Sequence, residues 1–317
     1  MATIERRVRN GKITYRVRYR DPALGRVLFR DWLGEWRATT TSLRASTRAR
    51  DETLLPRLAL PRFGAAPLAA ISQRDVRAWV ADLSAQGLAP ATVQKAYQLL
   101  GKVLGAAVDA GMLAQSPCRR VPLPKVEREE MRFLTPAEVA TLAAAIDRRY
   151  RALVLVGAYG GLRIGELAGL RRSRVDLLRG TVQVAEIVVE VRGVLHVGPP
   201  KTRASRRTAG LPRFVVEELA APHLAGRDDP EAFVFTAPEG GPLRVNLFRA
   251  RVWRPAIRAA GLDGLRIYDL RHTAVALWIA AGANPKEVSA RAGRGPSVAP
   301  GEPGNDKSAA DGPPTTP

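Results

Sequence analysis

The chain has 317 residues, of which 46% are hydrophobic, 6% aromatic and 25% charged, a composition that excludes a largely disordered protein and a length that allows two domains. Fifty Lys and Arg residues against thirty Asp and Glu residues give a formal net charge of +20, which favours a polyanionic partner and above all nucleic acid. One cysteine, Cys118, and three widely spaced histidines exclude an internal disulfide and a Cys/His metal cluster, and indicate a reducing, cytoplasmic location.

An anionic membrane surface is the alternative partner for so basic a chain. It would require a basic amphipathic helix or a lipid-attachment signal, and neither end of the sequence provides one. The most apolar run, residues 152–162, contains three glycines and is shorter than the ~20 residues that span a bilayer. We therefore expect nucleic acid and no membrane as the partner.

Residues 4–20 alternate hydrophobic and basic side chains on either side of Asn10-Gly11. An Asn-Gly pair between two alternating runs predicts a β-hairpin with a tight turn. Its Arg-rich face could lie along DNA phosphates or in a groove, although a solvated edge hairpin is an equally good interpretation of this segment alone. On the DNA-binding interpretation, the contacts come from Arg9, Lys12, Arg16 and Arg18.

From Leu28 to about Leu113 the hydrophobic residues recur at helical spacing. Ser72 can cap a helix over residues 73–86, and another helix is predicted over residues 92–112. The aromatic residues of this region are interpreted as core, because large aromatic side chains are usually buried. We expect a helical domain over residues 27–114, preceded by a partial domain over residues 1–26.

Residues 115–130 hold three prolines among basic and acidic side chains, which is typical of an interdomain linker. Thr135 and Glu138 have the spacing of a helix-capping box, with Pro136 at the first helical position. A second domain is therefore expected over residues 131–293.

Within this second domain, strand-like alternation over residues 182–212 ends in a basic turn at 199–207, and helices are predicted around 214–219, 247–260 and 269–281. Asn284 and Pro285 are expected to begin a short last helix that reaches about Ala292. Residues 294–317 contain four Gly and six Pro but no Leu, Ile, Phe, Trp or Tyr, which predicts a disordered tail. The predicted fold class is mainly α with a small antiparallel β-sheet (α+β).

Three basic residues of the second domain occur in distinct local contexts: Arg163 in GGLRIGEL, Lys201 in PPKTRASRR and Arg271 in YDLRHT. Two guanidinium groups meeting at one phosphodiester could stabilise the extra charge of a five-coordinate transition state without a metal, and a lysine could protonate the leaving sugar oxygen. Each residue taken singly is more simply a surface charge, and Arg163 with Glu166 could be a surface i, i+3 pair.

The strings GLRIGELAGLRRSRVD, PPKTRASRRTAGLP and YDLRHTAVALWIAAGANPKEVSARAG, taken together and in this order, resemble the catalytic-domain motifs of the tyrosine recombinases, in the phage integrase branch. The resemblance covers roughly residues 27–293. It implies that Arg163 and Arg271 are the two catalytic arginines, that Lys201 is the catalytic hairpin lysine, and that Glu166 orients the first arginine. Residues 28–113 are similar to the family's core-binding domain, and the N-terminal hairpin is similar to part of an arm-type DNA-binding domain.

The same resemblance implies the chemistry and the partners. A tyrosine attacks a DNA phosphodiester, forms a 3'-phosphotyrosyl link and lets a second strand religate, with no metal or nucleotide cofactor. The partners are double-stranded DNA of the attachment-site kind, together with further copies of the chain or other recombinase subunits, and the location is cytoplasmic and nucleoid-associated. Further DNA contacts are expected from Lys95, Arg203 and Arg206.

The sequence departs from the family pattern at the residues that would complete the chemistry. Tyr268 occupies the usual position of a catalytic histidine, where it could still hydrogen-bond a phosphate oxygen, and Arg294 occupies the position of a histidine or tryptophan. The nucleophilic tyrosine belongs further on, in a string similar to LDRYGH, yet no tyrosine follows Tyr268. Tyr268 is not expected to replace it, because it would lie beside Arg271 on the wrong element.

We therefore expect an integrase that binds DNA and is inactive in strand cleavage because no nucleophile is found. The change in composition at Arg294 indicates a shifted reading frame or a decayed gene. The alternatives are a non-catalytic regulator or competitor at recombination sites, and an enzyme that receives its tyrosine from another protein.

Overall fold

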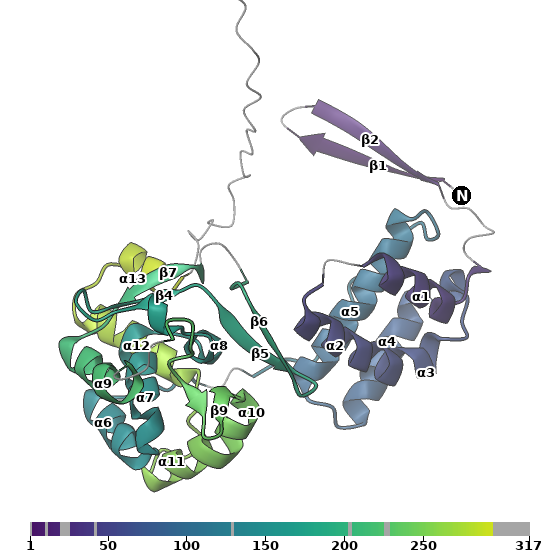
Figure 1. Ribbon diagram of the computed structural model, residues 1–317. Coiled ribbons are helices and arrows are strands. Elements are labelled where there is room, and N and C mark those ends of the chain that lie inside the picture. The colour runs from purple at the N-terminus through teal and green to yellow at the C-terminus, as the bar shows by residue number, and fades with distance from the viewer. Residues whose placement is uncertain are drawn as a thin grey trace, which may run out of the picture. The chain divides into compact units, whose positions relative to one another are not determined.

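The computed structural model describes residues 2–9, 12–19, 26–40, 43–127, 130–201, 205–224 and 229–293, without the side chains of residues 2–9, 12–19 and 221–224. Arg203, Arg294 and the tail predicted over residues 294–317 lie outside the described residues. The chain divides into two compact units, one of Met1–Glu130 with Val191–Val194 and one of Met131–Glu190 with Leu195–Pro317 (Figure 1).

The first unit begins with the predicted hairpin, whose two strands are confirmed. Strand β1 (Ala2–Arg9) pairs antiparallel with β2 (Lys12–Tyr19), and the register places Arg9 opposite Lys12. The side chains predicted to contact DNA here, those of Arg9, Lys12, Arg16 and Arg18, lie outside what the structure describes, so their role stays a prediction.

Five α-helices follow in the described part of this unit. Ser72 caps α4 as predicted, by accepting a hydrogen bond from the backbone N–H of Asp75, whose carboxylate in turn accepts from the N–H of Ser72. The elements are α1 (Phe29–Thr39), α2 (Ala45–Leu54), the π-helical η2 (Leu55–Ala59), α3 (Leu60–Phe63), the 3-10 turn η3 (Leu68–Ala70), α4 (Gln73–Ala85) and α5 (Pro90–Asp109).

Aromatic residues form the centre of this helical core, as predicted. Phe63 lies edge-on to Phe29 and to Trp79, with ring centroids 6.2 and 5.6 Å apart, and all three side chains are buried. The indole N–H of Trp79 donates to the carbonyl of Leu58 at 2.7 Å, and that of Trp32 donates to Val103 at 2.9 Å. Each buried indole therefore has the polar partner that it needs, and the two bonds fix how the helices meet.

The second unit is also mainly helical. Its helices are α6 (Pro136–Ala145), α7 (Arg148–Gly160), α8 (Ile164–Ala168), α9 (Arg213–Leu224), α10 (Val245–Phe248), the π-helical η6 (Arg249–Trp253), α11 (Arg254–Ala259), α12 (Asp269–Ala280) and α13 (Pro285–Arg291), with a 3-10 turn η4 (Arg172–Arg174). Thr135 caps α6 and Asn284 caps α13, both as predicted.

The strands of this unit are short and antiparallel. Strands β3 (Val175–Asp176), β4 (Thr181–Val184) and β7 (Arg207–Gly210) form one sheet in the order β3-β4-β7; β5 (Ile187–Val191) pairs with β6 (Val194–Gly198), and β8 (Thr236–Ala237) with β9 (Gly240–Pro242). The register β4–β7 places Arg207 opposite Val184 and Ala209 opposite Val182. The predicted fold class, mainly α with small antiparallel sheets, is confirmed.

Helix α7 is the centre of the second unit. It packs against α6, α9 and α12 (Figure 1). Apolar residues from Tyr150 to Ala158 are buried on all its sides. A Cβ at Gly157 would lie 2.9 Å from the side chain of Leu270 in α12, so the absence of a side chain lets these two helices approach closely. This contact fixes the position of Arg271, the residue after Leu270.

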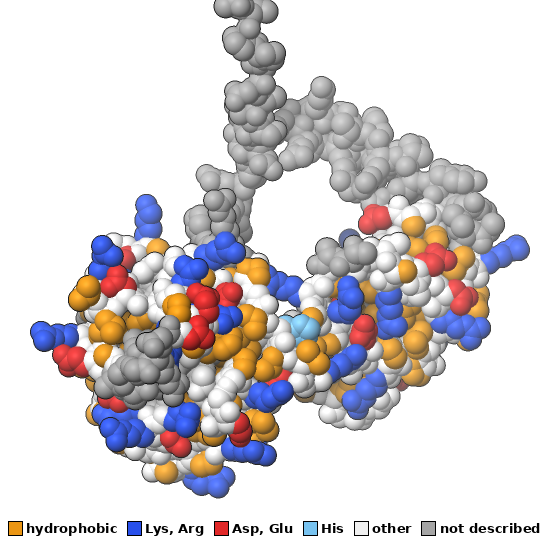
Figure 2. Space-filling model, in the orientation of Figure 1, with side chains coloured by type: hydrophobic (Ala, Val, Ile, Leu, Met, Phe, Trp, Pro, Cys, Tyr) orange, Lys and Arg blue, Asp and Glu red, His pale blue; other side chains and the backbone are white. Residues whose placement is uncertain are grey.

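On the face drawn in Figure 2 the basic side chains are spread over the surface. Figure 2 shows Lys and Arg side chains scattered over each unit, with acidic side chains among them, rather than gathered into one patch on this face. The net charge therefore does not by itself mark the binding surface. No helix in the described ranges has both the length and the apolar character that crossing a membrane requires.

Replacing Phe63 with alanine tests the core of the first unit. Because Phe63 is 2% exposed and contacts two other buried rings, we expect the substitution to lower the unfolding free energy of this unit by about 3–5 kcal/mol. Denaturant unfolding followed by tryptophan fluorescence measures the change. The control Leu178→Ala removes a fully exposed side chain and should change stability by less than about 0.5 kcal/mol; equal effects of the two would contradict the described core.

Candidate phosphate-binding site

Arg163 lies at the junction between two helices. Helix α7 ends at Gly160, and Gly161 adopts a left-handed conformation with φ of +66°. A Cβ at Gly161 would lie 2.6 Å from the indole of Trp278, so both the turn and the close contact require glycine. Arg163 follows as the N-cap residue of α8. The chain reversal therefore places the Arg163 side chain beside the end of α7.

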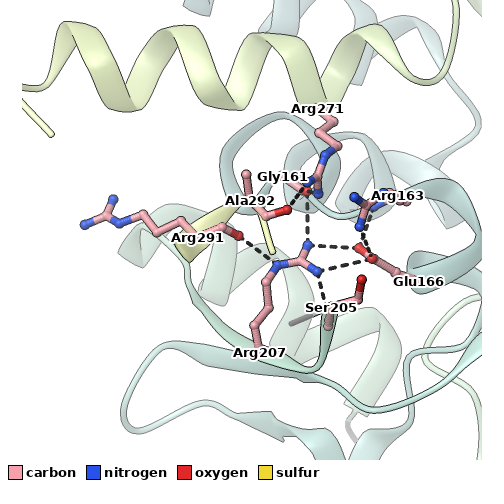
Figure 3. Close-up of polar contacts among 8 residues, drawn as sticks. All are labelled: Gly161, Arg163, Glu166, Ser205, Arg207, Arg271, Arg291 and Ala292. Atoms are coloured by element: carbon pink, nitrogen blue, oxygen red, sulfur yellow. Dashed lines mark hydrogen bonds and ion pairs between the residues drawn. The ribbon is translucent and has the colours of Figure 1, made fainter. Parts of the chain in front are cut away.

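The carboxylate of Glu166 joins two arginines (Figure 3). Arg163 donates to it from the backbone N–H and from Nη1, both at 2.8 Å, whereas Arg207 donates from Nη1 at 3.1 Å and from Nη2 at 2.9 Å. Glu166 is only 2% exposed, so the pair with Arg163 is not the surface pair that its i, i+3 spacing allowed. With four N–H donors, both oxygens of the carboxylate are fully used.

Arg271 reaches the same place from α12. Its Nη1 donates to the carbonyl of Gly161 at 2.6 Å, and its Nη2 donates to the carbonyl of Ala292 at the end of α13. The Gly161 carbonyl also accepts from Nη2 of Arg207 at 3.3 Å. One backbone oxygen therefore joins Arg207 to Arg271, and one carboxylate joins Arg207 to Arg163 (Figure 3).

The charges of this cluster do not cancel. Arg163, Arg207 and Arg271 against Glu166 leave two positive charges, which suits a phosphate group on which negative charge develops. Burial and the charges of Arg163 and Arg207 lower the pKa of Arg271 to about 10, so it remains a cation at neutral pH. Burial alone would raise the pKa of Glu166, but the hydrogen bonds and charges of Arg207 and Arg163 outweigh it and lower that pKa.

The two predicted arginines differ in how far they are open to solvent. The side chain of Arg163 is 35% exposed, whereas Arg271 is 3% exposed. Within the described residues Arg163 makes one side-chain hydrogen bond and Arg271 makes two. Since a guanidinium carries five N–H groups, both retain donors that an oxyanion could accept from.

Lys201 makes no hydrogen bond or ion pair with this cluster within the described residues. Lys201 is exposed in the loop between β6 and β7, and it takes no part in the contacts of Figure 3. Residues 202–204, which follow it, lie outside the described residues. The expected meeting of Arg163 and Arg271 is therefore present in the structure, whereas the approach of Lys201 stays a prediction.

Tyr268 lies at the start of α12, one turn before Arg271. It is 43% exposed, its ring lies edge-on to that of His272 with centroids 4.9 Å apart, and its phenol is among the groups that influence the pKa of Arg271. Tyr268 is thus partly open to solvent on the helix that carries Arg271. Of the other residues predicted to contact DNA, Lys95 on α5 and Arg206 before β7 are exposed.

Arg207 is the member of the cluster that sequence reasoning missed, since Arg206 was predicted instead. The signal was available in the alternation of strand β7. Ala209 is fully buried, and residues two apart on a strand face the same way, so Arg207 faces inward and Arg206 outward. The side chain of Arg207 is indeed only 6% exposed.

The donor set of the site consists of guanidinium and backbone groups, with Glu166 already saturated by N–H donors. No group of three or more His, Cys, Asp or Glu side chains suited to a metal occurs in the part of the chain that the structure describes. The cluster can bind an anion and stabilise charge on it.

Known proteins resemble this chain in sequence and in fold. Residues 132–293 match the Phage integrase family. The integrase of Mycobacterium phage FRAT1 is 32% identical over 246 residues, 74% of this chain and 70% of that protein. The integrase of Mycobacterium phage L5 is 31% identical over 239 residues, 74% of this chain but 63% of its own length.

Among solved structures, the Tn1549 transposon integrase in complex with a circular intermediate DNA has a TM-score of 0.74 at 19% sequence identity. The superposition covers 84% of this chain and 91% of that chain. The likeness shows a common fold.

The shared carboxylate gives the protein a specific response to acid. Because the folded-state pKa of Glu166 lies below its ordinary value of 4.5, its contribution to stability is fully present above that value and is lost as the pH falls through the folded-state pKa. Glu166→Gln should lower the unfolding free energy by roughly 3 kcal/mol at neutral pH. The difference in unfolding free energy between the variant and the wild type should become smaller below about pH 4.5. Denaturant unfolding of both proteins as a function of pH measures this difference. A difference that does not depend on pH would contradict the role given to the charged Glu166.

Proposed function

Because this chain belongs to the phage integrase family of tyrosine recombinases, we propose that it binds double-stranded DNA and holds one backbone phosphate between Arg163 and Arg271. The proposal rests chiefly on one observation. Arg163 and Arg271 are 108 positions apart in the sequence, yet each is hydrogen-bonded to a group that Arg207 also binds. For Arg163 this group is the Glu166 carboxylate, and for Arg271 it is the Gly161 carbonyl. Both guanidinium groups retain N–H donors. Guanidinium groups form charge-assisted hydrogen bonds to phosphate oxygens.

We assign Tyr268 a secondary role at this site. Its exposed side chain, one helical turn before Arg271, would donate a hydrogen bond to a phosphate oxygen, as the histidine of the family motif would. Lys201 would approach the leaving sugar oxygen from its loop, and Arg294 would take the place of the family's histidine or tryptophan. The remaining DNA contacts would come from Arg9, Lys12, Arg16, Arg18, Lys95, Arg203 and Arg206.

The family reaction requires a tyrosine hydroxyl that attacks phosphorus. These 317 residues contain no tyrosine after Tyr268, and the backbone N–H of Arg271 is hydrogen-bonded to the Tyr268 carbonyl on the same helical turn. We propose that this chain alone binds DNA without forming a covalent link. On DNA it would associate with further copies or with other recombinase subunits, in the nucleoid of the cytoplasm.

The test uses a short duplex selected for binding to the wild-type chain from a random-sequence library. We expect the affinity to fall steeply as salt rises, because binding to phosphates releases counterions. Arg163→Ala should weaken binding about tenfold, since one charge-assisted hydrogen bond contributes roughly 1.5 kcal/mol. Gel-shift titrations provide both measurements.

The control is Arg179→Ala. Arg179 is 84% exposed and, like Arg163, pairs with a carboxylate three residues away, in this case Asp176, but it lies outside the arginine cluster. Affinity that does not depend on salt, or an equal loss in both variants, would count against the proposed phosphate site. A nicked suicide substrate adds the second measurement. A covalent adduct with the pure chain would refute the proposal that the chain forms no covalent link, but it would not affect the proposal that it binds DNA.

A further inference from the structure

We infer that Arg207 is a positioning residue for the phosphate site, which keeps the Arg163 guanidinium available to DNA without contacting the DNA itself. This inference rests on the proposed function and adds to it a role for Arg207, which lies within the string PPKTRASRRTAGLP but was given no role there. It is drawn from the hydrogen-bond pattern of one side chain.

All five N–H groups of the Arg207 guanidinium have a partner. Nε donates to the carbonyl of Arg291 at 2.7 Å; Nη1 donates to Glu166 at 3.1 Å and to the Ser205 carbonyl at 3.3 Å; Nη2 donates to Glu166 at 2.9 Å and to the Gly161 carbonyl at 3.3 Å. A guanidinium has five donors and no acceptor. Arg207 therefore has no donor left for a phosphate oxygen.

The exposure of the two arginines agrees with this division of roles. The Arg207 side chain is 6% exposed, compared with 35% for Arg163. Arg207 shares the buried face of its sheet with Ala209, and it lies opposite Val184, whose side chain is 2% exposed. Arg207 is therefore a buried structural residue beneath the site, whereas Arg163 is open to a ligand.

Arg207 affects Arg163 through the carboxylate that they share. Glu166 accepts four N–H groups, and the two from Arg207 leave room for just one from the Arg163 side chain beside the backbone N–H. Without the Arg207 fork, the buried carboxylate would draw the Arg163 guanidinium into a two-bond fork of its own, because a buried charge must be compensated. Arg163 would then turn away from the phosphate.

Arg207 also joins elements that carry the second arginine. Its bond to the Arg291 carbonyl lies next to the bond between Arg271 and the Ala292 carbonyl, so both guanidiniums bind the C-terminal end of α13. Cations are favoured there by the helix dipole and by the unpaired carbonyls. The bond to Gly161 completes a continuous chain of hydrogen bonds from Arg163 through Glu166, Arg207 and the Gly161 carbonyl to Arg271 (Figure 3).

The experiment is a double-mutant cycle of Arg207→Lys and Arg163→Ala, with the selected duplex and gel-shift titration. Lysine keeps the positive charge but cannot form the two-bond fork. We expect Arg207→Lys to weaken DNA binding about as much as Arg163→Ala does, roughly tenfold. In the Arg163→Ala background the same lysine substitution should have a much smaller effect, since the residue through which it chiefly acts is absent. Additive losses in the cycle would overturn the inference.

The pH dependence of DNA affinity distinguishes a positioning role of Arg207 from a purely structural one, which would not change with the protonation of Glu166. The charged groups that influence Glu166 are Arg207 from β7 and Arg163 from the start of α8, with Arg271 from α12 as the remaining neighbour of the cluster. In Arg207→Lys, protonation of Glu166 would release Arg163. Because a fork from Arg163 favours the charged carboxylate, this protonation is expected only near and below the ordinary glutamate value of 4.5. DNA affinity should therefore recover towards the wild-type value as the pH falls from about 5 to about 4, whereas the wild-type profile should be flat over that range. A flat profile in the variant would also overturn the inference.

The controls separate this inference from the proposed function. Arg179→Lys is the same chemical change at an exposed arginine paired with a carboxylate three residues away, and it should bind DNA like the wild type. Circular dichroism checks folding; if the lysine variant does not fold, Arg207→Gln repeats the cycle with the same expected outcomes. Wild-type chain that fails to bind any duplex refutes the proposed function, whereas normal binding by a folded Arg207→Lys refutes only the role of Arg207.

Discussion

The site depends on how one buried carboxylate is compensated. A carboxylate that is 2% exposed must be hydrogen-bonded and paired with a cation if it is to stay charged. Glu166 meets this need with four N–H groups from two arginines. Because these arginines come from the α7–α8 junction and from strand β7, satisfying one charge joins two parts of the second unit. The surplus of cations over carboxylates then gives the same cluster an affinity for an anion.

The backbone around the cluster shows why this arrangement is specific. Gly161 supplies a left-handed turn, close contact with Trp278, and a carbonyl that accepts from both Arg207 and Arg271. The end of α13 supplies two more carbonyls to the same two arginines. Helix termini with unpaired carbonyls are favourable sites for cations, so α12, α13 and the α7–α8 junction are held together by polar contacts at the proposed phosphate site.

Local signals in the sequence predict much of the fold. The capping residues Ser72, Thr135 and Asn284 mark helix starts that the structure confirms, because a cap depends on side chains within three residues. The convergence of Arg163 and Arg271 depends on packing between distant elements, which the spacing of residues in the sequence does not predict. The resemblance to the family motifs predicted it. Arg207 was missed because the motif draws attention to Lys201, although the strand alternation with Ala209 indicates its inward orientation.

The central claim is that Arg163 and Arg271 bind the same backbone phosphate. A neutral methylphosphonate placed at each position of the selected duplex in turn, with binding measured for the wild type and for Arg163→Ala, tests it most directly. The account predicts one position whose neutralisation weakens wild-type binding strongly and Arg163→Ala binding by a clearly smaller factor, because the variant has already lost the Arg163 contact and keeps only the Arg271 contact at that phosphate. If the two proteins lose the same affinity at every position, Arg163 does not bind a single defined phosphate and the account is wrong.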